Sequence, residues 1–384
     1  MRFRASVKLK LLESAELLKQ RDFLRVLVNN LEIQVRQRRF KKSCKVTYVR
    51  IGSVLYEPTL ESLRLSLINS KISEIIPESI PGYWQLNPTI LNLNEEIYLC
   101  WRATNGVFSP VADKLGKMKL EKSTPQIRNQ ILIGELDKNF RLLNQRKIHE
   151  SIGAPSFEDP RGFDSKESNF VVGTVITEEP KQGLGKWKSS VGLLNIQTGE
   201  IRTISNPEGK QIEKNWVPIS FGPTSIELLY STNPHVEVEV DTLLFEAKFS
   251  SKSSEFIVPN ISGGSQFVRL SSGEFLRVGR QRFPVEGKGL IHFSYLLLYD
   301  ENLQLIKISR PFIFQKIGFE ICNGLLMARD GSLYFSWGED DRRLFVMKAE
   351  LSEVLSWLNK NEDRIVNFTQ NRTTYKATRK LLMS

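Results

Sequence analysis

The middle of the chain alternates short apolar segments with turn residues, whereas both ends follow a helical pattern. Between about residues 80 and 350, apolar segments of strand length are bounded by glycine, proline, asparagine, aspartate or serine. The clearest of these segments are residues 97–102, 170–174, 226–230, 274–278 and 333–338. This pattern predicts an all-β main body.

One unit recurs through this body. A polar or glycine-rich stretch leads into an apolar strand, and a turn and a second strand follow. The units start near residues 87, 159, 215, 264 and 324, at spacings of 72, 56, 49 and 60 residues. A repeat of this size, with about four short strands in each unit, is typical of a β-propeller, here with five blades. Two β-sandwiches are the alternative, but the repeated polar starts favour the propeller.

The two ends predict helical extensions. Leucine and alanine recur at helical spacing over residues 6–30, and apolar residues at 351, 354, 355, 357 and 358 predict a short helix before a C-terminal tail. We therefore divide the chain into a basic, helical and mixed extension (1–80), a five-bladed propeller (81–350), and a C-terminal helix with its tail (351–384).

The net charge of +11 is concentrated at the N-terminus. Residues 1–50 hold fourteen Lys and Arg against four Asp and Glu, including the basic run 36–42. Such a run is either a solvated connector or a contact for an anionic partner or a membrane surface. No nucleic-acid motif or aromatic platform accompanies it, so no specific nucleic-acid partner is expected.

Cysteine and histidine patterns indicate neither a metal site nor a disulfide framework. The three cysteines are far apart, and the chain has no CxxC or HExxH motif. We expect no metal and no cofactor. No apolar run reaches the ~18–20 residues that span a membrane, and no signal peptide is predicted. The expected compartment is the cytoplasm.

The polar blade starts carry the candidate chemistry. In a propeller the innermost strands line a central channel, so their first residues converge at one mouth. The candidate site residues at or near these positions are Asn87, Arg102, Glu158, Asp159, Arg161, Lys214, Asn215, Gln266, His292 and Asp341. Opposite charges around a concave mouth suit a polyhydroxylated substrate, with or without phosphate.

Each of these residues also has a simpler interpretation. Asn87 and Asp159 precede prolines and are typical turn formers. Lys214 and Asn215 fit a surface loop, and residues 338–341 fit a solvated acidic turn. His292 lies between apolar residues, which favours a buried core histidine over a ligand.

The motifs and their order resemble the five-bladed propellers of glycoside hydrolase family 130. The resemblance covers roughly residues 80–350. It rests on Asn87-Pro88-x-Ile90, Trp101-Arg102, Glu158-Asp159-Pro160-Arg161, Lys214-Asn215-Trp216-x-Pro218, Gly263-Gly264-x-Gln266 and Ser336-x-Gly338-x-x-Asp341. The family contains mannoside phosphorylases and mannosidases, and related propeller mannosyltransferases share the fold.

The resemblance implies a carbohydrate-active enzyme for mannoside-type glycosidic bonds, acting by inverting phosphorolysis, hydrolysis or mannosyl transfer. It implies that Asp159 is the general acid, that Asp341 binds sugar hydroxyls, and that an oligosaccharide or sugar phosphate is the partner, with inorganic phosphate as a co-substrate. Candidates for an incoming anion are Arg102, Arg161 and Lys214. The start of the fourth blade departs from the phosphorylases, because it has no basic residue until Arg269. The alternative is a non-catalytic glycan-binding or scaffold propeller.

Overall fold

The computed structural model describes most of the chain after residue 64. The described residues are 65, 67, 69–112, 118–123, 126–165, 168–178, 187–232, 234–252, 261–285, 289–316 and 318–363. The helix expected at 6–30 and the basic run 36–42 lie outside this part.

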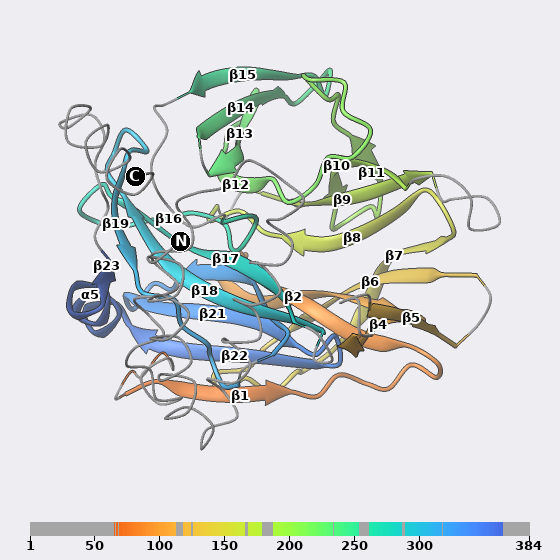
Figure 1. Cartoon of the computed structure of the whole chain (residues 1–384), viewed down its shortest axis with the longest axis horizontal. Coiled ribbons are helices and arrows are strands. Elements are labelled where there is room, and N and C mark those ends of the chain that lie inside the picture. The colour runs from red at the N-terminus through yellow and green to blue at the C-terminus, as the bar shows by residue number, and fades with distance from the viewer. Residues whose placement is uncertain are drawn as a thin grey trace, which may run out of the picture.

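Five antiparallel sheets surround a common centre, which confirms the five-bladed β-propeller (Figure 1). Blade one contains β2 (Trp84–Leu93), β3 (Glu96–Thr104), β6 (Arg128–Glu135) and β7 (Arg146–Ile152), and blade two contains β8 (Ser156–Arg161), β9 (Phe170–Glu178), β10 (Lys188–Asn195) and β11 (Ile201–Thr203). Blade three contains β12 (Val217–Phe221), β13 (Ser225–Thr232), β14 (His235–Asp241) and β15 (Ala247–Lys252). Blade four contains β16 (Val268–Arg269), β17 (Phe275–Val285), β18 (Gly289–Tyr299), β19 (Leu305–Ser309) and β23 (Glu362–Asp363). Blade five contains β20 (Glu320–Met327), β21 (Ser332–Glu339), β22 (Arg343–Glu350) and β1 (Lys71–Ile75). A separate hairpin, β4 (Gly106–Ala112) and β5 (Met118–Lys122), is inserted between β3 and β6.

The first described strand closes the ring. β1 pairs antiparallel with β22, so the outer strand of the last blade comes from the start of the propeller sequence. This pairing places residues 71–75 in blade five, ahead of the boundary at residue 80 that the sequence indicated. Ile75 is 3% exposed and packs in the apolar cluster that joins blades five and one.

We expect Ile75→Ala to destabilise the propeller by about 2–3 kcal/mol, because it opens a cavity at this closure. Ile72→Ala on the same strand is the matched control, since Ile72 is 40% exposed, and it should cost less than about 0.5 kcal/mol. Urea unfolding of both variants measures the difference, and equal losses would contradict the closure role of Ile75.

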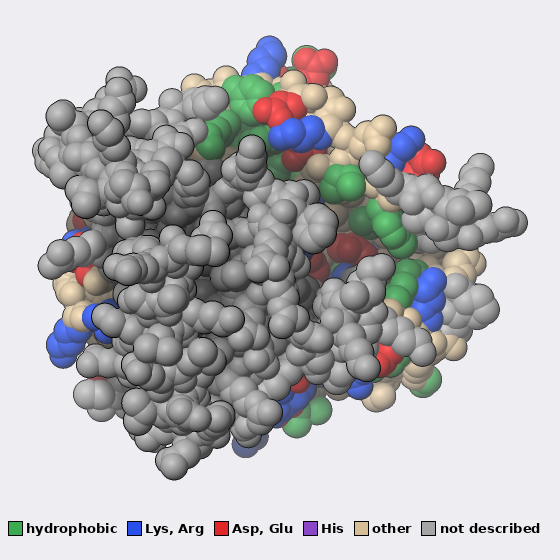
Figure 2. Space-filling view, in the orientation of Figure 1, with side chains coloured by type: hydrophobic (Ala, Val, Ile, Leu, Met, Phe, Trp, Pro, Cys, Tyr) green, Lys and Arg blue, Asp and Glu red, His purple; other side chains and the backbone are tan. Residues whose placement is uncertain are grey.

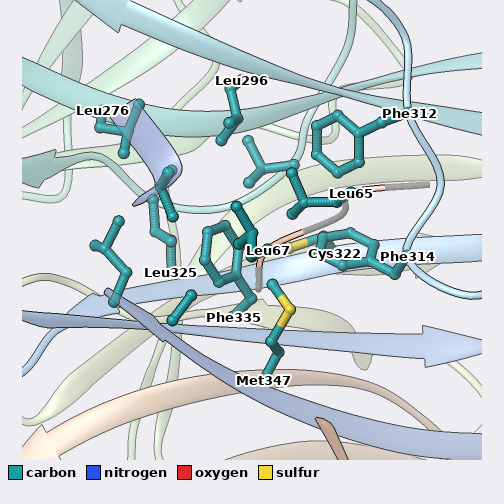
Figure 3. Close-up of a cluster of buried hydrophobic side chains, with 14 of the residues drawn as sticks. Leu65, Leu67, Leu276, Leu296, Phe312, Phe314, Cys322, Leu325, Phe335 and Met347 are labelled. Atoms are coloured by element: carbon teal, nitrogen blue, oxygen red, sulfur yellow. The ribbon is translucent and has the colours of Figure 1, made fainter. Parts of the chain in front are cut away.

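The C-terminal helix packs on blades four and five. Leu351–Lys360 forms α5, whose Val354 and Leu358 are buried, which confirms the helix expected after residue 350. The Trp357 and Phe312 rings meet edge to face at 5.4 Å. The cluster beneath the helix contains side chains from β17, β18, β20, β21 and β22, together with Leu65 and Leu67 (Figure 3). Among the described residues, no helix has the length and apolarity that a bilayer crossing requires.

Candidate functional site

Four of the five blades begin with a residue in the left-handed backbone region. These residues are Asn87 (φ 53°), Asp159 (φ 53°), Asn215 (φ 66°) and Gly264 (φ 105°). Asparagine, aspartate and glycine are the types that tolerate this conformation. In β2 and β8 the strand register shifts at the same point, so residues 87 and 159 lie in bulges. The sequence therefore uses turn formers at these positions to turn side chains out of the inner strands.

The first wall of the site is acidic. The Asn87 amide Nδ2 donates a hydrogen bond of 2.7 Å to Oδ1 of Asp159. Arg102 donates to Glu158 at 2.6 Å and lies 3.7 Å from the Asp159 carboxylate. Its Nε also donates to Asn129 at 2.9 Å. The Glu158 and Asp159 side chains remain 24% and 21% exposed, so both carboxyl groups reach the open mouth.

A third acid reaches this wall from blade five. Asp341 lies in the turn between β21 and β22 with φ 53°, and it is 7% exposed. A Cβ at Gly338 would lie 2.8 Å from the backbone nitrogen of Asn87. The glycine thus lets β21 approach the start of β2, and this approach brings the Asp341 turn to the acidic wall.

The three acids have different proton affinities. Burial alone would raise the pKa of Asp159, but the guanidinium groups of Arg102 and Arg161 and the amide of Asn87 outweigh it, and the pKa is lowered. Burial raises the pKa of Glu158, against the attraction of Arg102. Burial, followed by the like charge of Asp159, raises the pKa of Asp341 to about 7. Asp341 therefore has a higher proton affinity than Asp159.

Arg161 lies within the protein and does not face the mouth. Its side chain is fully buried and donates to the Gly264 carbonyl at 2.9 Å, the Asp159 carbonyl at 3.1 Å and Oδ1 of Asn215 at 3.2 Å. Arg161 therefore ties the starts of blades two, three and four together. The sequence indicated Arg161 and Arg102 as candidates for an incoming anion; in the fold Arg161 is buried against protein acceptors, and Arg102 donates to Glu158 and Asn129.

The second wall is basic. Arg280 of β17 donates to Oδ1 of Asn215 at 3.2 Å, and its charge acts on both Asp159 and Asp341. Desolvation of its amino group, followed by the charge of Arg282, lowers the pKa of Lys214. The Lys214 residue as a whole is exposed to solvent. Within the described residues, Lys214 and Arg282 make no hydrogen bond or ion pair. We call Lys214, Arg280 and Arg282 the cation wall.

Arg280 and Arg282 are not among the site residues that the sequence indicated. The second strand expected in the fourth blade ended at residue 278, and the start of that blade has no basic residue until Arg269. The signal was present in the alternation Arg280-x-Arg282, which places both side chains on one face of a strand. β17 and β18 each run for 11 residues, whereas the inner strand β16 has two, so β17 extends beyond β16.

Two predicted ligands lie in the interior. Gln266 is fully buried, and its amide donates to the Ile90 carbonyl at 3.3 Å and accepts from the Leu325 nitrogen at 3.2 Å. It therefore links blades one, four and five. His292 is 3% exposed on β18, directly across the strand pair from Arg282. Burial, followed by the charge of Arg280, lowers its pKa well below the usual range, so the imidazole is neutral.

Figure 2 shows acidic side chains at the bottom of a recess near the middle of the face in view. Within the part of the chain that the structure describes, no three His, Cys, Asp or Glu side chains are placed to hold a metal ion. The site thus combines an acidic wall of Glu158, Asp159 and Asp341 with the cation wall, and the two are close enough for Arg280 to act on Asp159 and Asp341 and for Lys214 to act on Glu158.

Several solved structures are similar to this chain over most of its length. A β-1,2-mannobiose phosphorylase from Listeria innocua is 12% identical, with 74% of this chain and 96% of that chain covered and a TM-score of 0.48. A mannose phosphorylase from Leishmania mexicana, in complex with phosphate, is 12% identical over 80% of this chain and 95% of that chain, with a TM-score of 0.47. A GDP-Man-dependent mannosyltransferase from Leishmania mexicana is 12% identical over 74% and 91%, also with a TM-score of 0.47. No protein-family model and no curated protein sequence matches this chain. At this level of identity, the reaction has to be argued from the side chains of the site.

Proposed function

We propose that the protein is a carbohydrate-active enzyme that transfers a mannosyl group between a sugar oxygen and inorganic phosphate with inversion. The observation that carries this proposal is the pairing of two walls across one mouth. The acidic wall suits the hydroxyl groups and developing positive charge of a sugar ring, and the cation wall suits an anion. The mannoside class comes from the resemblance of the blade-start motifs.

The cation wall favours phosphate over water as the acceptor. Arg102 pairs with Glu158, and the buried Arg161 offsets the charge of Asp159 from within the protein. Lys214, Arg280 and Arg282 together exceed the charge of the remaining acid, Asp341. A hydrolase has no need of this excess, whereas a dianion such as monohydrogen phosphate would neutralise it.

In this proposal Asp159 acts as an ionised carboxylate. The sequence assigned it the role of general acid, but its lowered pKa makes it a poor proton donor at neutral pH. Its Oδ1 accepts the Asn87 amide, which fixes its orientation. We assign it to the sugar, where a fixed negative charge stabilises the oxocarbenium character of the transition state.

Incubation of the full chain with α- and β-linked mannobioses, with and without phosphate, tests the proposal. Release of mannose 1-phosphate that depends on phosphate is the expected result. Release of free mannose at the same rate without phosphate would contradict the role of the cation wall. Binding of mannosides without any turnover would favour the glycan-binding propeller instead.

We expect Arg282→Met to raise the KM for phosphate by about 10- to 100-fold, with a smaller effect on the KM for the mannoside. One charge-assisted hydrogen bond to an anion contributes about 1.5–3 kcal/mol, which corresponds to this factor. Arg269→Met is the matched control, because Arg269 is an exposed arginine on the inner strand of the same blade. Equal KM values for phosphate in the two variants would exclude Arg282 from the anion site.

A further inference from the structure

The inner strand of blade five has a bulge like those of blades one and two. In β20 the strand register shifts between Cys322 and Gly324, so Asn323 is the bulged residue. The bulges that contain Asn87 and Asp159 occupy the corresponding positions in β2 and β8. Asn323 is therefore the counterpart, in the fifth blade, of two residues that already line the mouth.

Backbone contacts place Asn323 directly beneath the acidic wall. Its carbonyl accepts a hydrogen bond of 3.2 Å from Oγ1 of Thr89, and the same hydroxyl oxygen accepts the Gly162 nitrogen at 3.0 Å. Along their strands, Thr89 follows Asn87 by two residues and Gly162 follows Asp159 by three. The bulge of blade five thus meets blades one and two one step deeper in the channel than the acids.

The surroundings of Asn323 leave its side chain little room except toward the mouth. The buried Gln266 amide, which links β2 to β20, fills the level beneath. A Cβ at Gly324 would lie 2.5 Å from a backbone nitrogen of β2, and a Cβ at Gly338 would lie 3.1 Å from Oδ1 of Asn87. Blade five is therefore pressed against the start of blade one on both sides of the bulge.

The side chain at this position has polar atoms that the protein does not satisfy. Asn323 is fully buried, yet neither of its amide atoms has a hydrogen-bond partner among the described residues. Oδ1 of Asn87, whose Nδ2 donates to Asp159, is also buried and without a partner there. Most buried polar atoms in folded proteins are hydrogen-bonded, and an exception points to a bound group that supplies the bond. The two asparagines together present one donor and two acceptors.

We propose that Asn323 forms the floor of the mouth and binds a ring hydroxyl group of the sugar there, together with Asn87. A hydroxyl group can accept from Nδ2 of Asn323 and donate to Oδ1 of either asparagine. It needs little more room than a water molecule, which fits a fully buried position. A phosphate dianion suits this floor poorly, because two acceptor oxygens face it. The inference rests on the sugar part of the proposed function and adds a residue that belongs to none of the blade-start motifs.

Calorimetric titration of the full chain with methyl α- and β-mannosides, without phosphate, tests this contact. Asn323→Leu keeps the bulk of the side chain, and it should weaken mannoside binding about 10- to 100-fold because two hydrogen bonds are lost. The resistance to urea should stay the same or rise, since an apolar side chain replaces an unpaired buried amide. If leucine prevents folding, Asn323→Ala removes the same amide without adding bulk.

Asn92→Leu is the matched control. Asn92 is also a buried asparagine of an inner strand with an Oδ1 that lacks a partner among the described residues, but it lies five residues beyond Asn87 near the other end of β2. Its substitution should leave mannoside affinity within about twofold of wild type. An equal loss of affinity in Asn92→Leu and Asn323→Leu would contradict a specific contact at the floor.

Mannosides that lack a single hydroxyl group identify the contact. Removal of the hydroxyl that reaches the floor should weaken binding to wild type and cost nothing further in Asn323→Leu, because both changes remove the same contact. Additive losses at every ring position, or full affinity of Asn323→Leu for the parent mannoside, would mean that the floor holds only an ordered water. Either result would overturn the proposal, as would a wild-type chain that binds no mannoside. Mannoside binding without turnover would refute the phosphorolysis alone, and the same titrations would still decide the role of Asn323.

Discussion

Asp159→Asn is expected to reduce turnover of both a mannobiose and a mannosyl fluoride by about 10³-fold, a factor typical for the loss of one fixed electrostatic contact to the transition state. In the proposed function Asp159 is an ionised carboxylate that faces the sugar; Asn87 donates to it at 2.7 Å, and Arg102 lies 3.7 Å from it. Asparagine keeps the shape of the side chain and loses its charge. Steady-state rates on both substrates measure the effect.

The matched control for this variant is Asp164→Asn, which removes another carboxylate a few residues further along the chain. Asp164 lies beyond the end of β8 and accepts the Arg269 backbone nitrogen at 3.4 Å, and within the described part of the chain it makes no hydrogen bond or ion pair with the acidic wall. Its substitution should leave turnover within about twofold of wild type. If Asp159→Asn lost activity on the mannobiose alone, Asp159 would act as the proton donor and not as a fixed charge.

Arg161→Met is expected to destabilise the propeller by about 3–5 kcal/mol, the largest loss of stability among the variants considered. Three acceptors from blades two, three and four share this buried guanidinium. Methionine fills part of the volume but leaves the Gly264 and Asp159 carbonyl groups and the Asn215 amide oxygen without this donor. Each buried acceptor that loses its donor costs about 1–3 kcal/mol. Thermal and urea unfolding measure the loss.

Arg128→Met is the control for the loss of an arginine as such, because Arg128 is exposed on β6. It should change stability by less than about 0.5 kcal/mol. A stable Arg161→Met protein that had lost only phosphate binding would contradict the buried role of Arg161 and return it to the anion site.

The propeller itself could be predicted from the sequence because its signals are local. Strand-length apolar segments, turn residues and a repeated polar start recur once in each blade. Asn87, Asp159 and Asn215 were visible as turn formers, and the left-handed backbone that they adopt explains why those residue types occur there. The same left-handed backbone therefore explains both why turn-forming residue types occur at these positions and why their side chains lie at the mouth.

The roles of the individual side chains could not be predicted, because they depend on contacts between blades. Its motif alone predicts that Arg161 is a cation of the mouth. In the fold it is buried and donates hydrogen bonds to Gly264 and Asn215, which lie more than fifty positions away in the sequence. Gln266 likewise makes hydrogen bonds with backbone groups of Ile90 in β2 and Leu325 in β20. These residues are 176 and 59 positions away from it in the sequence. Nothing in the local sequence distinguishes such an interior link from a ligand.

By itself, the sequence determined the number of blades, the order of their starts and the acids that meet at the mouth. These follow from periodicity and residue type, which a linear pattern records. Only the tertiary structure decided that the outer strand of blade five comes from residues 71–75, that Arg280 and Arg282 form the cation wall, and that Asp159 and Asp341 differ in proton affinity. The physical reason is that burial, charge pairing and ring closure arise between segments that are distant in sequence.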